Sequence, residues 1–284
     1  MKKFGLLTVL LALAGLNVTI AQENASGYNP NSVYPVHDAD IMFEKRIWRR
    51  MDLREKQNQA FFASNREITK VIMEAAKAGL IQPYVNDSLL TPMSKEKFLE
   101  NLVVPGTEDA GTDEFGDTGG GWGDTGGGGG WGDSGGEDAA PAAPAGPAYF
   151  LPNQITVLEI SEDMIFDKKR SRMYFDIQSV TLMLPPNDAG LVLPMATFKY
   201  KDLEKLFRSM PEEAIWFNRQ NSRGHLNLAD AFNLRLFAAR IIKVANPGDE
   251  YIVDVYNKTP KQAILASDWL EQQLMEYEHE LWEF

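Results

Sequence analysis

The segment from Gly106 to Pro147 constrains the architecture more than any other feature, because it cannot build a core. It consists largely of glycine, aspartate, alanine and proline, with Gly-Asp-Thr and Gly-Asp-Ser repeats around Trp122 and Trp131. It holds nine acidic residues and no basic one. A chain with so few apolar groups does not offset its ordering entropy. We therefore expect a flexible, Gly/Asp/Ala/Pro-rich linker over residues 105–149 between two folded parts.

Residues 1–21 have the pattern of a cleavable secretory signal peptide. Lys2 and Lys3 supply the positive start, residues 4–16 the apolar run, and Ala21 ends a small-residue cleavage site. A membrane anchor is the alternative, but the run is shorter than the roughly 20 residues that span a bilayer. The sequence has no cysteine, which excludes a lipid anchor on a new N-terminal cysteine. The sequence therefore predicts export from the cytoplasm with no direct membrane span.

Composition limits the chemistry of the folded parts. Without cysteine there are no disulfides, thiolate metal sites or thiol nucleophiles. Hydrophobic residues make up 44% of the sequence, which is enough for a sizeable core. The formal net charge of -12 comes largely from the linker and argues against nucleic acid as a partner.

Residues 22–104 show mainly helical periodicity. Over residues 41–56, a turn of 100° per residue gathers apolar side chains on one arc and basic side chains on the opposite side, which predicts an amphipathic helix. The apolar set is Ile41, Phe43, Ile47, Trp48 and Met51, and the basic set is Lys45, Arg46, Arg49, Arg50 and Lys56. Further helices are expected over residues 64–79, where Ser64 and Glu67 form a capping box, and over residues 94–102.

Residues 150–284 predict an α+β domain with a small antiparallel sheet. The expected elements are strands at 154–160, 163–166, 172–184 and 251–256, helices at 200–209 and 227–244, and a last helix from Ser267. The charged turn at residues 167–170 joins two of these strands as a hairpin. The fold class is therefore α+β: a helical N-terminal region, a disordered Gly-rich linker and a C-terminal α+β domain.

Motifs for cofactors and metals are weak. Gly121-x-Gly123-x-x-Gly126 matches the dinucleotide fingerprint in spacing, but no strand precedes it and no helix follows it. The Gly-Asp repeats lack the large apolar residue of calcium-binding nonapeptides, which leaves at most a weak cation site. No cofactor and no metal site is expected. The three histidines, which fit no metal-binding spacing, are His37, His225 and His279.

The sequence leaves one class of enzyme possible, a glycosidase. The sequence has no nucleophile elbow, no Ser-x-x-Lys and no phosphate-binding loop. Glycosidases, however, need only two carboxylates at the right distance. Glu212 and Glu213 lie near Trp216 in the sequence. A cell-wall or glycan-acting enzyme therefore remains the alternative, although a surface turn after Pro211 is the more ordinary explanation of these residues.

Two charged helices indicate an interface. The final helix carries five glutamates, and no lysine or arginine follows Lys261, so negative charge opposes its dipole. One interpretation is a solvated acidic face. The other is that this end docks on the basic face of residues 45–56 in a neighbouring copy, a head-to-tail contact that can close a ring. The interface candidates are Arg46, Arg49, Arg50, Glu278, Glu280, Trp282 and Phe284.

Four strings carry a family resemblance. They are DADIMFEKRIWRRMDLREKQNQAFF (38–62), LIQPYVNDSLLTPMSKEKF (80–98), LADAFNLRLFAARIIKVANP (228–247) and EYEHELWEF (276–284). They resemble the gliding motility protein family GldN, also called PorN, of the type IX secretion apparatus of Bacteroidetes. The resemblance covers most of both folded parts, and the long Gly/Asp/Trp linker departs from it.

The resemblance implies a noncatalytic structural subunit in the periplasm, held at the outer membrane by protein partners. Those partners would be an outer-membrane lipoprotein of the GldK or PorK type, the periplasmic part of a GldM or PorM motor protein, and other copies of the chain in a ring. The family has no catalytic motif, so no site residue is transferred from it. A secretion-ring scaffold is thus the favoured function, and a glycan-acting enzyme is the alternative.

Overall fold

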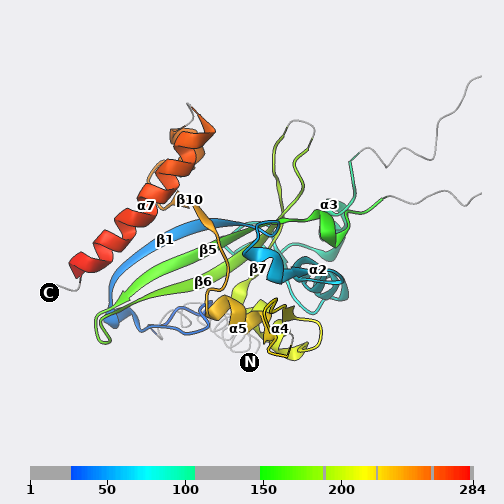
Figure 1. The fold of residues 1–284 in the computed structure, drawn as a ribbon, viewed down its shortest axis with the longest axis horizontal. Helices are drawn as coiled ribbons and strands as arrows, with labels where there is room; N and C mark the ends of the chain where they lie inside the picture. Colours follow the sequence, from blue (N-terminus) through cyan, green and yellow to red (C-terminus); the bar gives the residue numbers. More distant parts are fainter. Residues whose placement is uncertain (1–26, 106–147, 188–189, 222, 257–258, 282–284) are drawn as a thin grey trace, which may run out of the picture.

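The computed structural model describes residues 27–105, 148–187, 190–221, 223–256 and 259–281 (Figure 1). The predicted signal peptide and residues 106–147 of the predicted linker lie outside the described residues. In the described part of the chain, no helix is long and apolar enough to cross a bilayer.

A six-stranded sheet with strand order β10-β1-β5-β6-β7-β4 is the centre of the fold. Every neighbouring pair of strands is antiparallel. The strands are β1 (Ile41–Asp52), β4 (Pro83–Tyr84), β5 (Val157–Asp167), β6 (Arg172–Met183), β7 (Pro194–Lys199) and β10 (Arg240–Val244). Because β1 and β4 precede the predicted linker and the other strands follow it, the two sides of the linker share one sheet. The fold is α+β, but residues 22–104 do not form a separate helical region.

The helix expected over residues 41–56 is wrong, because most of this segment is β1. β1 pairs with β5 along its length and with β10 at one end. The apolar residues Phe43, Ile47 and Met51 follow one another at intervals of four, and this interval fits both the helical period and the strand period. Pairing with strands distant in the sequence therefore decides the structure of this segment.

Local signals predict three helices correctly. α2 (Ile68–Ala78) ends at Gly79, whose φ of 78° is left-handed, as is typical of a helix stop. α3 (Lys95–Asn101) begins after Ser94, whose hydroxyl accepts a hydrogen bond from the backbone N–H of Lys97. α4 (Tyr200–Ser209) has the expected bounds.

The capping box at Ser64 is wrong, because a short hairpin occupies this segment. The hairpin joins β2 (Phe62–Ala63) to β3 (Arg66–Glu67). Glu67 is the residue before α2, and its side chain caps no helix N–H. The remaining short elements are the 3-10 helices η3 (Asp38–Asp40), η4 (Asn58–Phe61) and η5 (Pro152–Gln154), and the strands β8 (Ile215–Trp216) and β9 (Leu226–Asn227).

The C-terminal elements are predicted in part. The hairpin of β5 and β6 is confirmed, and the carboxylate of Asp167 accepts hydrogen bonds from the backbone N–H groups of its turn. The helix expected over residues 227–244 is wrong beyond α5 (Leu228–Asn233), because Arg235 adopts a φ of 52° and β10 follows. The strand expected over residues 251–256 is wrong and is replaced by α6 (Ile252–Val255). α7 (Pro260–Leu281) begins earlier than the expected Ser267.

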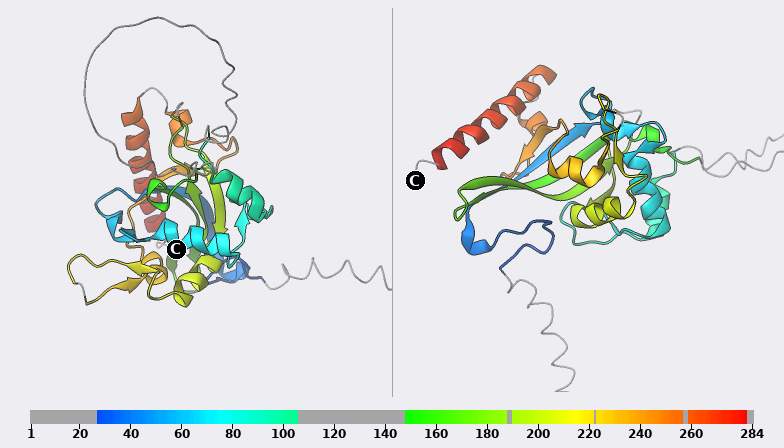
Figure 2. Two further views of the ribbon diagram at one scale, coloured as in Figure 1. Left: turned by 90° about the vertical axis from the view of Figure 1, so that its right-hand side faces the viewer. Right: turned by 60° about the horizontal axis from the view of Figure 1, so that its bottom comes forward.

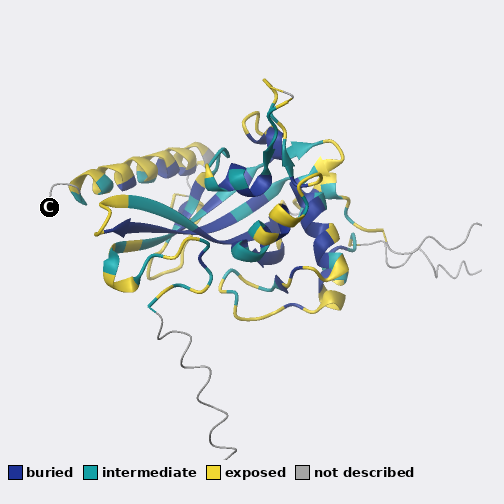
Figure 3. Ribbon diagram, turned by 90° about the horizontal axis from the view of Figure 1, so that it is seen from below, coloured by how far each residue is buried: buried dark blue, intermediate teal, exposed yellow. Residues whose placement is uncertain are grey.

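The buried apolar residues form two clusters. In the large cluster, α2 to α5 pack on the sheet, and the ring of Phe232 lies 5.3 Å from those of Phe61 and Phe237. The small cluster lies under α7 and consists of Ile47, Met164, Ile241, Ile252, Ala266 and Leu274. Figures 1 and 2 show α2, α4 and α5 towards one end of the sheet and α7 apart from them. The outer side of α7 is exposed over most of its length (Figure 3).

Both edges of the sheet are protected against further strand pairing. On β10, the hydroxyl of Ser267 in α7 donates to the carbonyl of Ile241 at 2.7 Å, and the side-chain amide of Asn246 donates to the carbonyl of Val244 at 2.9 Å. β4 is short and contains Pro83. Short, proline-containing or capped edges resist pairing with another chain, so contacts with partners are expected through side chains.

Candidate interaction surface around the C-terminal helix

The arginines of β1 lie on both faces of the strand, because side chains alternate along it. Arg46 and Arg50 lie on one face and Arg49 on the other. Arg46 donates two hydrogen bonds to the buried carboxylate of Asp163, at 2.7 and 2.8 Å. Arg50 lies 3.4 Å from Glu159, and burial raises the pKa of Glu159 above its ordinary value. The single basic face expected from a helix is therefore wrong.

Ionisation of Asp176, which lies opposite Asp163 on the neighbouring strand β6, is unfavourable. Burial raises the pKa of Asp176 from 3.8 to about 6, and the negative charges of Asp163 and Glu44 add to the effect. Gln178 donates a hydrogen bond to this carboxylate at 2.7 Å and offsets part of the cost.

Asp176→Asn is expected to raise the free energy of unfolding by about 1–2 kcal/mol near pH 8 and to change it little near pH 4. The folded pKa is raised, so the unfolded chain ionises first as the pH rises from 3.8 to about 6, and the wild type loses stability over this window. Asparagine stays neutral and keeps an acceptor for Gln178. Urea unfolding at both pH values measures the difference, with the exposed Asp254→Asn as control. An equal gain at both pH values would contradict the titration of Asp176.

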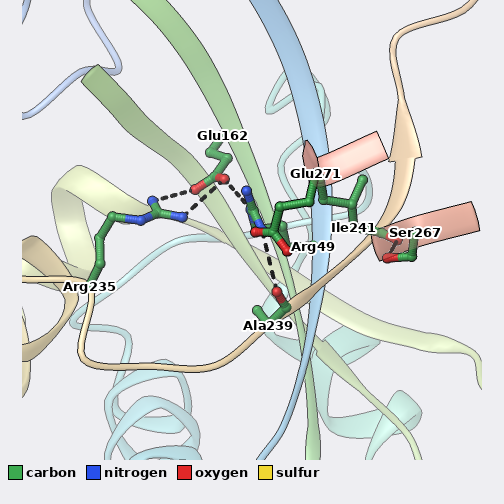
Figure 4. Close-up of polar contacts among 7 residues, drawn as sticks. All are labelled: Arg49, Glu162, Arg235, Ala239, Ile241, Ser267 and Glu271. Carbon is green, nitrogen blue, oxygen red and sulfur yellow. Dashed lines mark hydrogen bonds and ion pairs between the residues drawn. The ribbon is translucent and has the colours of Figure 1, made fainter. Parts of the chain in front are cut away.

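Arg49 is buried between β5 and α7. Its Nε donates to Glu162 Oε1 at 2.6 Å, and its Nη1 donates to Glu271 Oε1 on α7 at 3.0 Å (Figure 4). Glu162 is fully buried and also accepts hydrogen bonds from both terminal nitrogens of Arg235, at 2.7 and 3.2 Å. One buried carboxylate thus holds two guanidinium groups, and Arg49 connects the sheet to α7. We name this group the ionic layer: Arg49, Glu162, Arg235 and Glu271.

The ionic layer separates the two apolar clusters along the sheet. On β1, Arg49 lies between Ile47 of the small cluster and Met51 of the large cluster. On β5, Ile160 belongs to the large cluster and Met164 to the small one, with Glu162 between them. α7 therefore packs on an apolar patch of its own, and charged groups divide that patch from the main core.

The predicted attraction between the acidic final helix and the arginines of β1 exists within one chain, at Arg49 and Glu271. Phe43 on β1 also packs against Tyr277 of α7, with ring centroids 4.7 Å apart. Arg49 is buried by these contacts and is not accessible to a neighbouring copy. The contact between copies stays a prediction for the other candidates.

Of the remaining acidic candidates, Glu278 lies beside the ionic layer and Glu280 lies further along α7. Glu278 lines a groove of about 940 Å³ together with Arg49, Arg235 and Arg240. Glu280 is exposed on the last turn of α7, and Trp282 and Phe284 lie outside the described residues.

The outer side of α7 also carries large exposed apolar side chains. Trp269 is 52% exposed, and the others are Ile264, Leu265 and Met275. Exposed apolar side chains that cluster beside charged groups are typical of protein contact surfaces. Acidic and apolar groups therefore share the surface of α7.

Glu162 and Arg235 were not among the sequence candidates. Arg235 lies within an expected helix, and no local pattern marks it as a paired residue. Glu162 carries one usable signal, because an acidic residue interrupts the apolar alternation of Ile160 and Met164. Such an interruption in a buried strand indicates a paired charge.

The buried carboxylate of the ionic layer, Glu162, is not free for acid–base chemistry. Both carboxylate oxygens of Glu162 accept hydrogen bonds from guanidinium groups. The layer therefore serves to hold the strands and α7 together. Glu212 and Glu213 are exposed in the turn after α4, and Trp216 is partly buried against Phe61, with ring centroids 6.5 Å apart. Among the described residues, no group of histidine, aspartate and glutamate is arranged to hold a metal ion.

Comparison with known families agrees with the resemblance seen in the sequence. The family model described as gliding motility associated protein GldN matches residues 36–283. No curated protein matches the sequence. The matched range includes β1, the whole ionic layer and α7. The chain belongs to the GldN family, a component of the gliding motility and type IX secretion machinery.

Proposed function

We propose that the protein is a noncatalytic, periplasmic structural subunit of this machinery. In the proposed assembly it forms a ring with other copies and with an outer-membrane lipoprotein of the GldK or PorK type, and it contacts the periplasmic part of a GldM or PorM protein. The family match over residues 36–283 carries the proposal. The predicted signal peptide and the lack of cysteine support export without a lipid tether.

The surface of α7 supports a scaffold role. It presents exposed acidic and apolar side chains along one rigid helix, and the helix is fixed to the sheet by the ionic layer and the small cluster. Arg46 and Arg50 remain about two-fifths exposed, so they are accessible to an acidic partner, whereas Arg49 acts by holding α7. We propose that Glu278 and Glu280 with the outer side of α7 form the main contact.

Reversing two charges on α7 tests this proposal. Glu278→Lys/Glu280→Lys is expected to remove the protein from a very large complex with the outer-membrane lipoprotein, because the contact then brings like charges together. Pull-down from periplasmic extract with the mature chain, followed by native mass measurement, gives the readout. Glu212→Lys/Glu213→Lys is the matched control, since it reverses two exposed charges elsewhere, and it is expected to keep the complex.

Two outcomes would contradict the proposal. A wild-type chain that stays a lone monomer in extract would remove the scaffold role, and turnover of cell-wall glycan by that monomer would favour the enzyme alternative. Equal loss of the complex in both charge-reversal variants would show that α7 is not the contact.

A further inference from the structure

We propose that a pocket between β2, β3 and β8 binds the acidic segment 106–147 of the same copy through one of its tryptophans. We name this site the arginine-rimmed pocket. It is separate from the ionic layer and from the proposed partner surface on α7, so it goes beyond the proposed function.

The pocket joins an apolar floor to a basic rim. Its volume is about 730 Å³. Apolar groups of Leu53, Phe62, Ala63 and Phe217 line it, and Phe217 is 40% exposed. The rim carries the three guanidinium groups of Arg54, Arg66 and Arg219. Its lining residues include no aspartate or glutamate.

The floor is held in place by a backbone hydrogen bond and a ring contact. The N–H of Phe217 donates to the carbonyl of Ala60 in η4 at 2.9 Å, which fixes the β8 segment against η4. The ring of His225 packs against Phe217 with centroids 4.7 Å apart. A concave apolar site that is already formed loses little conformational freedom when a side chain enters it.

Two of the three rim charges are available to a ligand. Arg54 forms a 2.7 Å ion pair with Asp52. Arg219 donates a hydrogen bond to the neutral side chain of Gln59 at 3.0 Å, and neither Arg219 nor Arg66 makes an ion pair within the described part of the chain. An aromatic anchor flanked by carboxylates fits this arrangement, because the ring fills the floor while guanidinium groups bind carboxylates and stack on indole faces.

The segment 106–147 has this composition. It holds nine acidic residues and no basic one, and Asp124 and Asp133 each follow a tryptophan by two residues, after Trp122 and Trp131. The rim and the segment are therefore complementary in charge. Tryptophan is also enriched among the residues that carry most of the binding energy at contacts.

The pocket is within reach of this segment in the same copy. A flexible chain of roughly 40 residues has a root-mean-square end-to-end distance of about 35 Å. The residues that flank the segment on its two sides lie close together, because Val103 and Tyr149 form a β-bridge. The hydroxyl of Thr69 in α2 donates to the carbonyl of Pro152 at 2.8 Å, and α2 follows directly after Arg66 on the rim.

Fluorine NMR of the mature chain labelled with 5-fluorotryptophan tests the proposal. Trp122→Phe and Trp131→Phe assign the two resonances of the segment. We expect at least one of them to differ in shift from the free peptide of residues 113–138 and to move to the free position in Arg66→Glu/Arg219→Glu. Both arginines are exposed, so the reversal is expected to leave the fold intact. The shift is expected to be unchanged on dilution.

The matched control reverses two lysines at another groove. Lys95 and Lys205 line the pocket between α2 and α4, and Lys95→Glu/Lys205→Glu is expected to leave the segment bound. Three results would overturn the proposal: free-peptide shifts in the parent chain, equal release by both charge reversals, or a shift lost on dilution, which would assign the segment to a second copy. Binding of the 113–138 peptide to a chain with a Gly-Ser segment in its place is expected to weaken at least tenfold in Arg66→Glu/Arg219→Glu.

Discussion

Glu162→Ala is expected to lower the free energy of unfolding by about 3–5 kcal/mol. The substitution removes the carboxylate that pairs with both Arg49 and Arg235, and Arg49 is left buried, with Glu271 and the carbonyl of Ala239 as its remaining acceptors. Arg235 is about a third exposed, so water solvates part of its charge after the ion pair with Glu162 is lost. Urea unfolding followed by far-UV circular dichroism measures the effect.

Two further variants identify the cause. Arg49→Met/Glu162→Leu is expected to recover most of the lost stability, because apolar side chains of similar volume leave no unpaired charge at the centre of the layer. Glu159→Ala removes an acid from the other face of β5, where its pair with Arg50 is loose at 3.4 Å, and is expected to cost about 1 kcal/mol. A double variant as unstable as Glu162→Ala would show that the layer stabilises the fold by more than pairing its charges.

The elements that the sequence predicts are those with local causes. Ser94 caps α3, Gly79 ends α2, and the carboxylate of Asp167 organises the turn of the β5–β6 hairpin. Each of these signals acts within a few residues of chain. They were therefore visible without the structure.

The elements that were predicted wrongly depend on distant partners. β1 has apolar spacings that fit a helix, and only β5 and β10 make it a strand. The segment after α5 carries helix-compatible residues, but Arg235 turns out of the helix to reach Glu162. Pairing with segments distant in the sequence can override a local secondary-structure preference, and a sequence pattern alone does not show this pairing.

The same limit applies to the candidate site. Opposite charges on the β1 segment and on the final helix were visible in the sequence, and Arg49 and Glu271 do pair. The sequence does not say whether two such groups meet within one chain or between copies. It also does not place Glu162, because the layer exists only when β1, β5 and α7 lie together.

Leu274→Asp is expected to detach α7 while the large cluster stays folded. Leu274 is 8% exposed and belongs to the small cluster, so an aspartate there loses apolar packing and buries a charge, at a cost of about 3–4 kcal/mol. Because the ionic layer separates this cluster from the main core, the substitution is expected to lower the free energy of local unfolding of α7. Hydrogen exchange measured by mass spectrometry is expected to show protection of α7 amides lowered by roughly two to three orders of magnitude.

Matched variants connect this stability effect to function. Leu265→Asp places the same charge on the exposed side of α7, where Leu265 is 55% exposed, and is expected to leave exchange in α7 unchanged. If α7 is the contact with the secretion machinery, Leu274→Asp removes the complex because the helix loses its fixed position, and Leu265→Asp weakens it because the charge lies in the contact itself. Loss of protection in α2 and β6 together with α7 would show a single cooperative core and would contradict the separating role of the ionic layer.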